Sequence, residues 1–455
     1  MNQPEDVEVI LGYGRHYKFH SGTLARNSPL FADMLTEPNA AQLSSRARNA
    51  GIKIRWMIEL VQLPCDKYPA GRFDLVKLNK LGERADNCEG LIVNENGLIP
   101  QAKKCFKQYE SILYAFYNKD LVIKGTNMVT ALEHCDDLLE KSDYLGCTNV
   151  ISKPIEVALL KYGQEVFQAI ANAPHAWVKL AVRIRSELLF QECLVHLVGN
   201  WRALEKKPHL DVRKQLSEIP GLVALIERHH KQLLERCQKL ELSIVSLIPS
   251  TILPSQYATR ADLAKHILGW AALTFYREWF TQCLVKNQGQ HAADCGYALY
   301  KELGAGADAD ADRELLKEFQ ETKFTTSSKA VRVMEHHLMD IKNCVKEVVE
   351  EYGILTSKCQ LNVEKFPVSY LTCVVFDKRE YPWESHMQGG ALGKRKKYLP
   401  GGNDIAMLNL NSARKSKGIS GVDMREGEEG DEGDDEFESD DMESGSERGK
   451  RTKMT

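Results

Sequence analysis

The sequence lacks the segments that would mark a secreted or membrane protein and the motifs of common enzyme classes. Its first residues contain no basic stretch and no apolar stretch, which argues against a secretory signal. No apolar run approaches the roughly 18 residues of a spanning helix. GxGxxG, P-loop, HExxH and GxSxG motifs are all absent. We therefore expect a protein that is not an enzyme, uses no cofactor and has no membrane partner.

Closely spaced cysteine pairs are also lacking. The chain has 12 cysteines, but no two of them have CxxC spacing. Together with the missing secretory signal, this pattern predicts free thiols in a reducing compartment.

Charge of one sign is concentrated near the C-terminus. From Asp423 onwards there are 14 acidic and 5 basic residues, which leaves 49 acidic and 55 basic residues in the rest of the chain. The resulting net charge of +6 is too weak to predict nucleic-acid binding. Residues 389–455 are poor in periodic apolar residues, and their acidic part repels itself. We expect them to form a disordered, basic-then-acidic tail.

A basic tetrad, Lys394, Arg395, Lys396 and Lys397, lies near the start of this tail. An import receptor could recognise such a run as a nuclear signal, and a solvated charge run without a partner is an equal alternative. We expect the protein in the nucleus or the cytoplasm, with the nucleus slightly favoured.

The N-terminal residues predict a hairpin followed by short helices. Residues 5–11 alternate charged and apolar side chains, and residues 17–20 follow a glycine-rich turn. Thr23 is expected to cap a short helical turn. Ser28 is expected to cap a helix over residues 29–35, because a proline directly after the cap loses no hydrogen bond.

Several spaced residues in this region resemble the signature of a BTB/POZ domain. The matching positions are Asp6, Phe19, His20, Leu24, Ser28, Phe31 and, in a later helix, Tyr117. The resemblance covers residues 1–150 and implies an α+β fold, with residues 65–104 as an insertion that contains strand-like pieces at 73–78 and 90–93. It also implies self-association through apolar positions. The candidates are Val7, Val9, Leu24 and Leu30, which are equally compatible with a core role.

The resemblance leaves two interpretations for Asp6 and His20. In some BTB transcription factors the aspartate belongs to a charged pocket for corepressors, and a basic residue follows the histidine. Here Ser21 follows it. We therefore favour local hydrogen bonds of Asp6 and His20 that hold the fold.

From residue 151 to residue 388 the apolar period becomes helical. Gly199 and Asn200 are expected to end a first helical stretch, and further helices are expected over 209–247, 263–285 and 327–352. A helical region after a BTB domain resembles proteins that are common in fungi.

Two histidine pairs, His229–His230 and His336–His337, are the visible candidates for metal ligands. Adjacent residues on a helix point roughly 100° apart, so neither pair can chelate through one face. We interpret them as ordinary helix residues and predict no metal site.

The expected fold class is an α+β BTB/POZ domain, then an all-α helical domain, then a disordered tail. The expected function is a protein–protein interaction scaffold that forms a homodimer through the BTB domain. The alternative is a substrate adaptor of a cullin-based ubiquitin ligase. The hydrophobic-x-Glu motif of such adaptors occurs here as Leu35-Thr36-Glu37, about four residues early. Co-purification with a cullin would separate the two.

Overall fold

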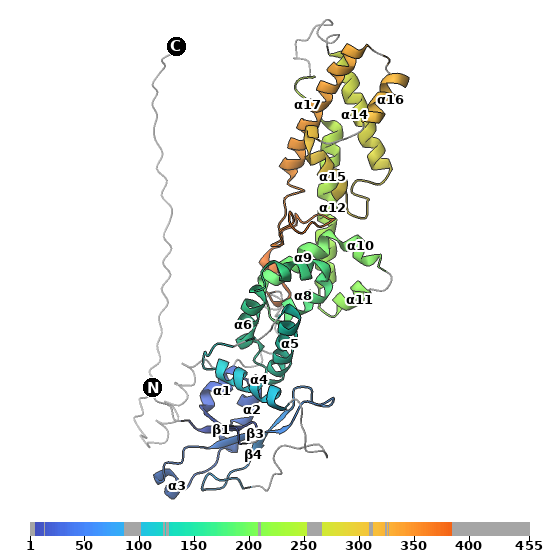
Figure 1. Cartoon of the computed structure of the whole chain (residues 1–455). Helices are drawn as coiled ribbons and strands as arrows, with labels where there is room; N and C mark the ends of the chain where they lie inside the picture. The colour runs from blue at the N-terminus through green and yellow to red at the C-terminus, as the bar shows by residue number, and fades with distance from the viewer. Residues whose placement is uncertain are drawn as a thin grey trace, which may run out of the picture. The chain divides into compact units, whose positions relative to one another are not determined.

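The computed structural model describes residues 5–12, 14–85, 102–121, 123, 127–207, 211–252, 266–308, 313–323, 325 and 327–384. All of them belong to one unit, Met1–Gly389. This unit is mostly helical, with one small mixed sheet near its N-terminus (Figure 1). Residues 90–93, the tetrad Lys394–Lys397 and the expected disordered tail lie outside the described residues. No helix in the described part is long and apolar enough to cross a membrane.

The sheet has four strands in the order β2-β1-β3-β4. Its strands are β1 (Val7–Ile10), β2 (His16–Phe19), β3 (Trp56–Gln62) and β4 (Arg72–Val76). The expected hairpin is confirmed, because β1 pairs antiparallel with β2. β1 also pairs parallel with β3, and β3 pairs antiparallel with β4.

Two short helices follow the hairpin, α1 (Ser21–Asn27) and α2 (Pro29–Met34). The predicted cap of α2 is confirmed: the Ser28 hydroxyl accepts a hydrogen bond from the Phe31 backbone and donates one of 2.6 Å to the Leu145 carbonyl. α1 begins two residues before the expected cap at Thr23. The Asp6 carboxylate accepts hydrogen bonds of 2.7 Å from the backbone N–H and the hydroxyl of Ser21, which replaces that cap.

β4 lies within residues 65–104, the segment that we expected to be an insertion. Its Phe73 is 1% exposed and packs edge-on against Phe31 and Tyr109, with ring centroids 5.8 and 4.9 Å apart. The Phe73 N–H also donates to the Tyr144 hydroxyl at 3.0 Å. The first part of this segment is therefore core. Alternating side chains predict a strand, but they do not reveal which strand or helix it packs against.

Helices make up most of the remaining described chain (Figure 1). Their bounds are α3 (Ser45–Asn49), α4 (Ala102–Ala115), α5 (Met128–Leu145), α6 (Thr148–Leu160), α7 (Gln164–Asn172), α8 (Pro174–Arg183), α9 (Glu187–Gly199), α10 (Trp201–Glu205), α11 (Val212–Ser217), α12 (Leu222–Ser246), α14 (Ile267–Val285), α15 (Tyr297–Gly304), α16 (Arg313–Thr322) and α17 (Ser328–Tyr352), with short 3-10 turns at η1 (Glu37–Asn39), η2 (Gly306–Asp308) and η3 (Lys378–Glu380). The predicted end of a helix at Gly199–Asn200 is confirmed.

α9 is buried around nearly its whole circumference. Its sequence ELLFQECLVHLVG places apolar residues on every face, and all residues from Cys193 to Gly199 are buried. A helix that is apolar all round must be covered by other elements. α8 and α12 pack against it, and a returning segment of the chain completes the cover.

That returning segment, residues 354–384, is called the strap below. It begins after Gly353, which ends α17 in the left-handed conformation with φ of 55°. Tyr381 and Trp383 near its end pack against Phe190 of α9, with ring centroids 5.2 and 5.0 Å apart. The strap therefore links the end of α17 to a helix that lies about 160 residues earlier in the sequence.

Candidate functional site

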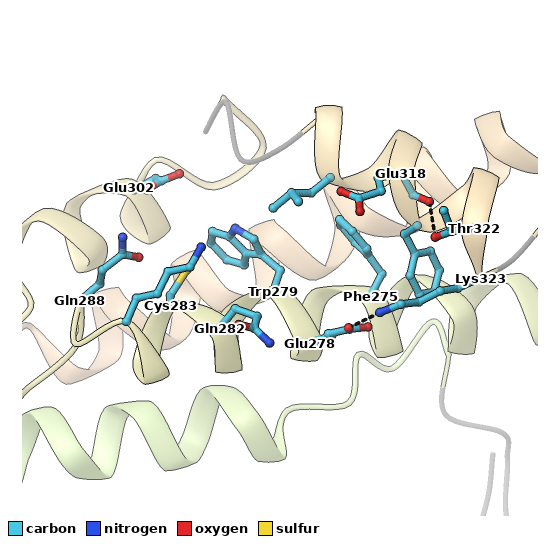
Figure 2. Close-up of a pocket in the computed structure, with 13 residues that line it drawn as sticks. Phe275, Glu278, Trp279, Gln282, Cys283, Gln288, Glu302, Glu318, Thr322 and Lys323 are labelled. Atoms are coloured by element: carbon cyan, nitrogen blue, oxygen red, sulfur yellow. Dashed lines mark hydrogen bonds and ion pairs between the residues drawn. The ribbon is translucent and has the colours of Figure 1, made fainter.

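A cavity of about 540 Å³ opens between α14 and α16 (Figure 2). Its floor is apolar, because Phe275, Trp279 and Cys283 follow one another at four-residue steps along one face of α14. α16 contributes Leu315 and Phe319, and the Phe319 ring lies 5.3 Å from that of Phe275. This cavity is called the groove below.

The rim of the groove is charged. Glu278 of α14 forms an ion pair with Lys323, just after α16, and both side chains are substantially exposed. Glu302, Glu318 and Lys286 also line the groove. Figure 2 shows Phe275 and Trp279 between these charged ends. The rim therefore holds three carboxylates against two ammonium groups around an aromatic floor.

α17 packs along α14 and holds it in place. Met334, Leu338 and Ile341 of α17 recur at helical spacing and are all buried, and α14 packs along this helix. The groove therefore has a fixed wall on α14 and a second wall on the short helix α16.

A second cluster of functional side chains ties the strap to α9. Glu192 and His196 lie one helical turn apart on α9, 2% and 0% exposed, with Glu192 Oε1 3.2 Å from His196 Nε2. The other ring nitrogen, Nδ1, lies 2.9 Å from the Tyr370 hydroxyl. The backbone N–H groups of Gln360 and Leu361 donate to the Glu192 carboxylate at 2.6 and 3.1 Å. Glu192, His196, Tyr370 and these two N–H groups are called the clasp.

Gly199 lets the strap approach α9 closely. A Cβ atom at this position would lie 2.0 Å from the Leu371 carbonyl oxygen, which is far inside van der Waals contact. The strap therefore runs directly against the helix backbone, one turn beyond His196.

Cys359 lies beside the clasp. Its sulfur, a Glu192 oxygen and a His196 nitrogen all lie within 4.8 Å of one another. Burial is the main cause that raises the pKa of the Cys359 thiol, and the Glu192 charge raises that pKa further. These three side chains are potential metal ligands that the sequence prediction, which considered histidine pairs, did not include.

The predicted N-terminal site residues lie in or against the core. Val7, Val9, Leu24, Phe19 and Phe31 are buried.

Leu30 is partly buried against the same core. Asp6 binds Ser21, whereas the His20 N–H donates to the Tyr117 hydroxyl at 2.9 Å. The Asp6 contact is near in sequence, as expected, whereas the partner of His20 lies 97 residues later in the chain.

The two histidine pairs lie on α12 and α17. His229 Nε2 contacts Glu380 of the strap at 2.8 Å, and His230 Nδ1 contacts the Val198 carbonyl at 2.9 Å. His336 is exposed and His337 is partly buried. The two members of the α12 pair therefore face different partners.

The BTB/POZ interpretation is wrong. No BTB/POZ family matches the chain; the family that matches is the FF domain, elsewhere in the sequence. The residues that carried the resemblance are buried apolar side chains and a helix cap. Other small α+β regions impose the same requirements, so these residues do not identify one family.

The model of the fungal FF domain family matches residues 248–351. No curated protein and no solved structure matches the chain. The matched segment includes α14, α15, α16 and nearly all of α17, and therefore the whole groove. The clasp lies outside it. Residues 248–351 are thus similar to an FF domain.

Proposed function

We propose that this protein binds other proteins, and that the groove between α14 and α16 receives a short segment of a partner. FF domains are generally protein-interaction modules. The observation that carries the proposal is the aromatic floor inside the segment that resembles an FF domain. A volume of about 540 Å³ suits a few apolar side chains, in the way that amphipathic helices insert anchors into grooves.

The rim defines the chemistry of the partner. Because Lys323 is engaged with Glu278, the charges left at the rim are those of Glu302, Glu318 and Lys286. We expect a partner segment with an aromatic or aliphatic anchor flanked by lysine or arginine. Charge at a rim mainly affects association rate and specificity, while the buried anchor supplies most of the affinity.

A photo-crosslinking residue at Leu315 tests the groove directly, because this side chain lines it and is 41% exposed. The control position is Met339 on α17, which is 49% exposed and outside the lining. We expect a crosslinked partner from position 315 and not from position 339. The double variant Glu302→Lys/Glu318→Lys should reduce that crosslink, whereas Glu335→Lys on α17 should not. Equal crosslinking from both positions would contradict the proposal.

We further propose a non-enzymatic role, because the sequence contains none of the common catalytic motifs. Homodimerisation through a BTB domain and recruitment of a cullin depended on the BTB resemblance, and they lose their basis with it. Protein binding does not depend on it.

We also propose that Lys394–Lys397 acts as a nuclear address, which remains an expectation from the sequence. Replacement of the four residues by alanine should move a tagged full-length protein from the nucleus to the cytoplasm. An unchanged distribution would reject this signal.

A further inference from the structure

We propose that Glu192, His196 and Cys359 form a binding site for Zn²⁺ that fixes the strap to α9. The three side chains offer one oxygen, one nitrogen and one sulfur, all within 4.8 Å of one another. Carboxylate, imidazole and thiolate are the ligand types that proteins use for zinc. This site is independent of the groove and of the proposed protein binding.

The helix positions two of the ligands. Glu192 and His196 are four residues apart on α9 and therefore project from the same face. In tetrahedral coordination, with Zn–N and Zn–O bonds of about 2.0–2.1 Å, the two ligand atoms lie about 3.3 Å apart. The distance from His196 Nε2 to Glu192 Oε1 is 3.2 Å. The two atoms therefore have the spacing of two ligands on one zinc ion, and the side chains must turn from their present hydrogen bond so that both point at it.

The strap supplies the third ligand. A Zn–S bond of about 2.3 Å places the sulfur about 3.6 Å from each of the other two ligand atoms. The Cys359 sulfur lies within 4.8 Å of one Glu192 oxygen and one His196 nitrogen, so the strap must bring it closer by on the order of 1 Å to complete the site. Cys359 is only partly buried, whereas Glu192 and His196 are 2% and 0% exposed, so the metal ion and the water for its fourth position would have to enter from the Cys359 side.

Neighbouring groups of the strap already orient His196 and Glu192 by hydrogen bonds, as the groups around the ligands do in known zinc sites. Metal-binding histidines use their second nitrogen to bind an oxygen that fixes the ring, and Tyr370 is 2.9 Å from Nδ1 of His196. The backbone N–H groups of Gln360 and Leu361 fix the Glu192 carboxylate. Both supports come from the strap.

Zinc binding has a simple proton balance. The contacts of the ring fit the tautomer with its proton on Nε2, which donates to the Glu192 carboxylate while Nδ1 accepts from the Tyr370 hydroxyl. With zinc on Nε2, the ring proton moves to Nδ1 and donates to the Tyr370 oxygen. The ring therefore gains and loses no proton, and the Cys359 thiol releases one proton to solvent as its sulfur binds the metal.

The test uses Co²⁺ as a spectroscopic probe on the purified, metal-stripped full-length protein. We expect a thiolate-to-cobalt absorption band in the near ultraviolet that saturates at one equivalent and disappears when Zn²⁺ is added. Cys359→Ser should abolish the band. Cys344→Ser, a partly buried cysteine on α17, is the matched control and should retain it.

A second measurement separates binding at this site from binding at another cysteine. Zn²⁺ should raise the melting temperature of the wild type and of Cys344→Ser, and leave that of Cys359→Ser unchanged. Absence of the cobalt band in the wild type, or its persistence in Cys359→Ser, would overturn the proposal. In that case the three side chains serve the clasp through hydrogen bonds alone.

Discussion

The polar groups of the clasp are buried, whereas those at the rim of the groove are exposed to solvent. In the clasp, Glu192 is 2% exposed and its carboxylate accepts hydrogen bonds from the strap backbone and from His196. At the rim of the groove, Glu278 and Lys323 form a pair whose side chains are 42% and 56% exposed. The first arrangement holds parts of one chain together. The second places solvated charges and the exposed Leu315 around an aromatic floor whose Phe275 and Trp279 are each 8% exposed.

This difference predicts where substitutions act. Removal of a buried partner leaves other buried groups without hydrogen bonds, which lowers the free energy of unfolding. Removal of an exposed charge costs little, because water replaces the lost partner. The clasp should therefore respond in stability, and the groove should respond in binding.

The largest effect is expected for Glu192→Ala. This substitution strips the buried His196 and two strap N–H groups of their acceptor, and we expect a loss of about 3–5 kcal/mol in the free energy of unfolding. Glu187→Ala on the same helix is the control, because its pair with Lys378 is exposed, and it should cost less than about 1 kcal/mol. Urea unfolding measures both. Similar losses for the two variants would remove the distinction between buried and exposed carboxylates on α9.

Gly199→Ala tests whether a substitution at this position raises or lowers the stability of the protein. In an exposed helix, alanine in place of glycine would stabilise by about 1 kcal/mol. Here the new Cβ would lie 2.0 Å from the Leu371 carbonyl oxygen, so the strap must move. We expect a net loss of about 1–3 kcal/mol, measured by thermal and urea unfolding. A gain in stability would show that the strap does not run against α9.

The pH dependence of stability provides a third test, through His230. Burial lowers the pKa of this imidazole, and Nε2 has no hydrogen-bond partner among the described residues. The unfolded chain binds a proton near the ordinary pKa of about 6.5, while the folded chain binds it only at lower pH. Its contribution to stability is therefore complete above that value and is lost as the pH falls through the folded pKa.

His230→Gln should make the stability of the protein less dependent on pH below about 6.5. Gln retains a donor for the Val198 carbonyl but cannot take up the proton. Urea unfolding of both proteins between about pH 5 and 8 measures the difference. Parallel stability curves for the two proteins would contradict the assignment.

The smallest effect on stability is expected at the rim of the groove. Glu318→Lys changes an exposed side chain on α16, and we expect a change within about 0.5 kcal/mol. The same variant should weaken binding of a basic partner segment. A large loss of stability without a loss of binding would reverse the comparison between the two regions.

The sequence predicted features that depend on near neighbours in the chain. Ser28 followed by Pro29 correctly located the start of α2, because a cap and its helix are adjacent. Alternating residues correctly predicted the β1–β2 hairpin for the same reason. The role of Phe73 was missed, since its partners Tyr109 and Tyr144 lie far along the sequence.

The clasp was missed for the same physical reason. Glu192 and His196 look like ordinary members of a helix, and their partners Gln360 and Tyr370 follow more than 160 residues later. The spacing of apolar residues along a helix gives no information about a contact with such a distant part of the chain. A buried charged residue in an otherwise apolar helix was the available signal, because a buried carboxylate requires partners. The groove left a weaker trace, an aromatic face along α14.

The return of the strap has a mechanical consequence. The segment that resembles an FF domain begins just after α12 and ends within α17. Glu380 of the strap pairs with Arg228 and His229 in the first half of α12, at 2.6 and 2.8 Å. The two segments that flank residues 248–351 are therefore fastened to each other. Tension applied to the chain beyond Glu384 should be carried first by the contacts of η3 and the clasp with α12 and α9, before it reaches α14 or α17. In a pulling experiment, the groove should keep its shape until that fastening breaks.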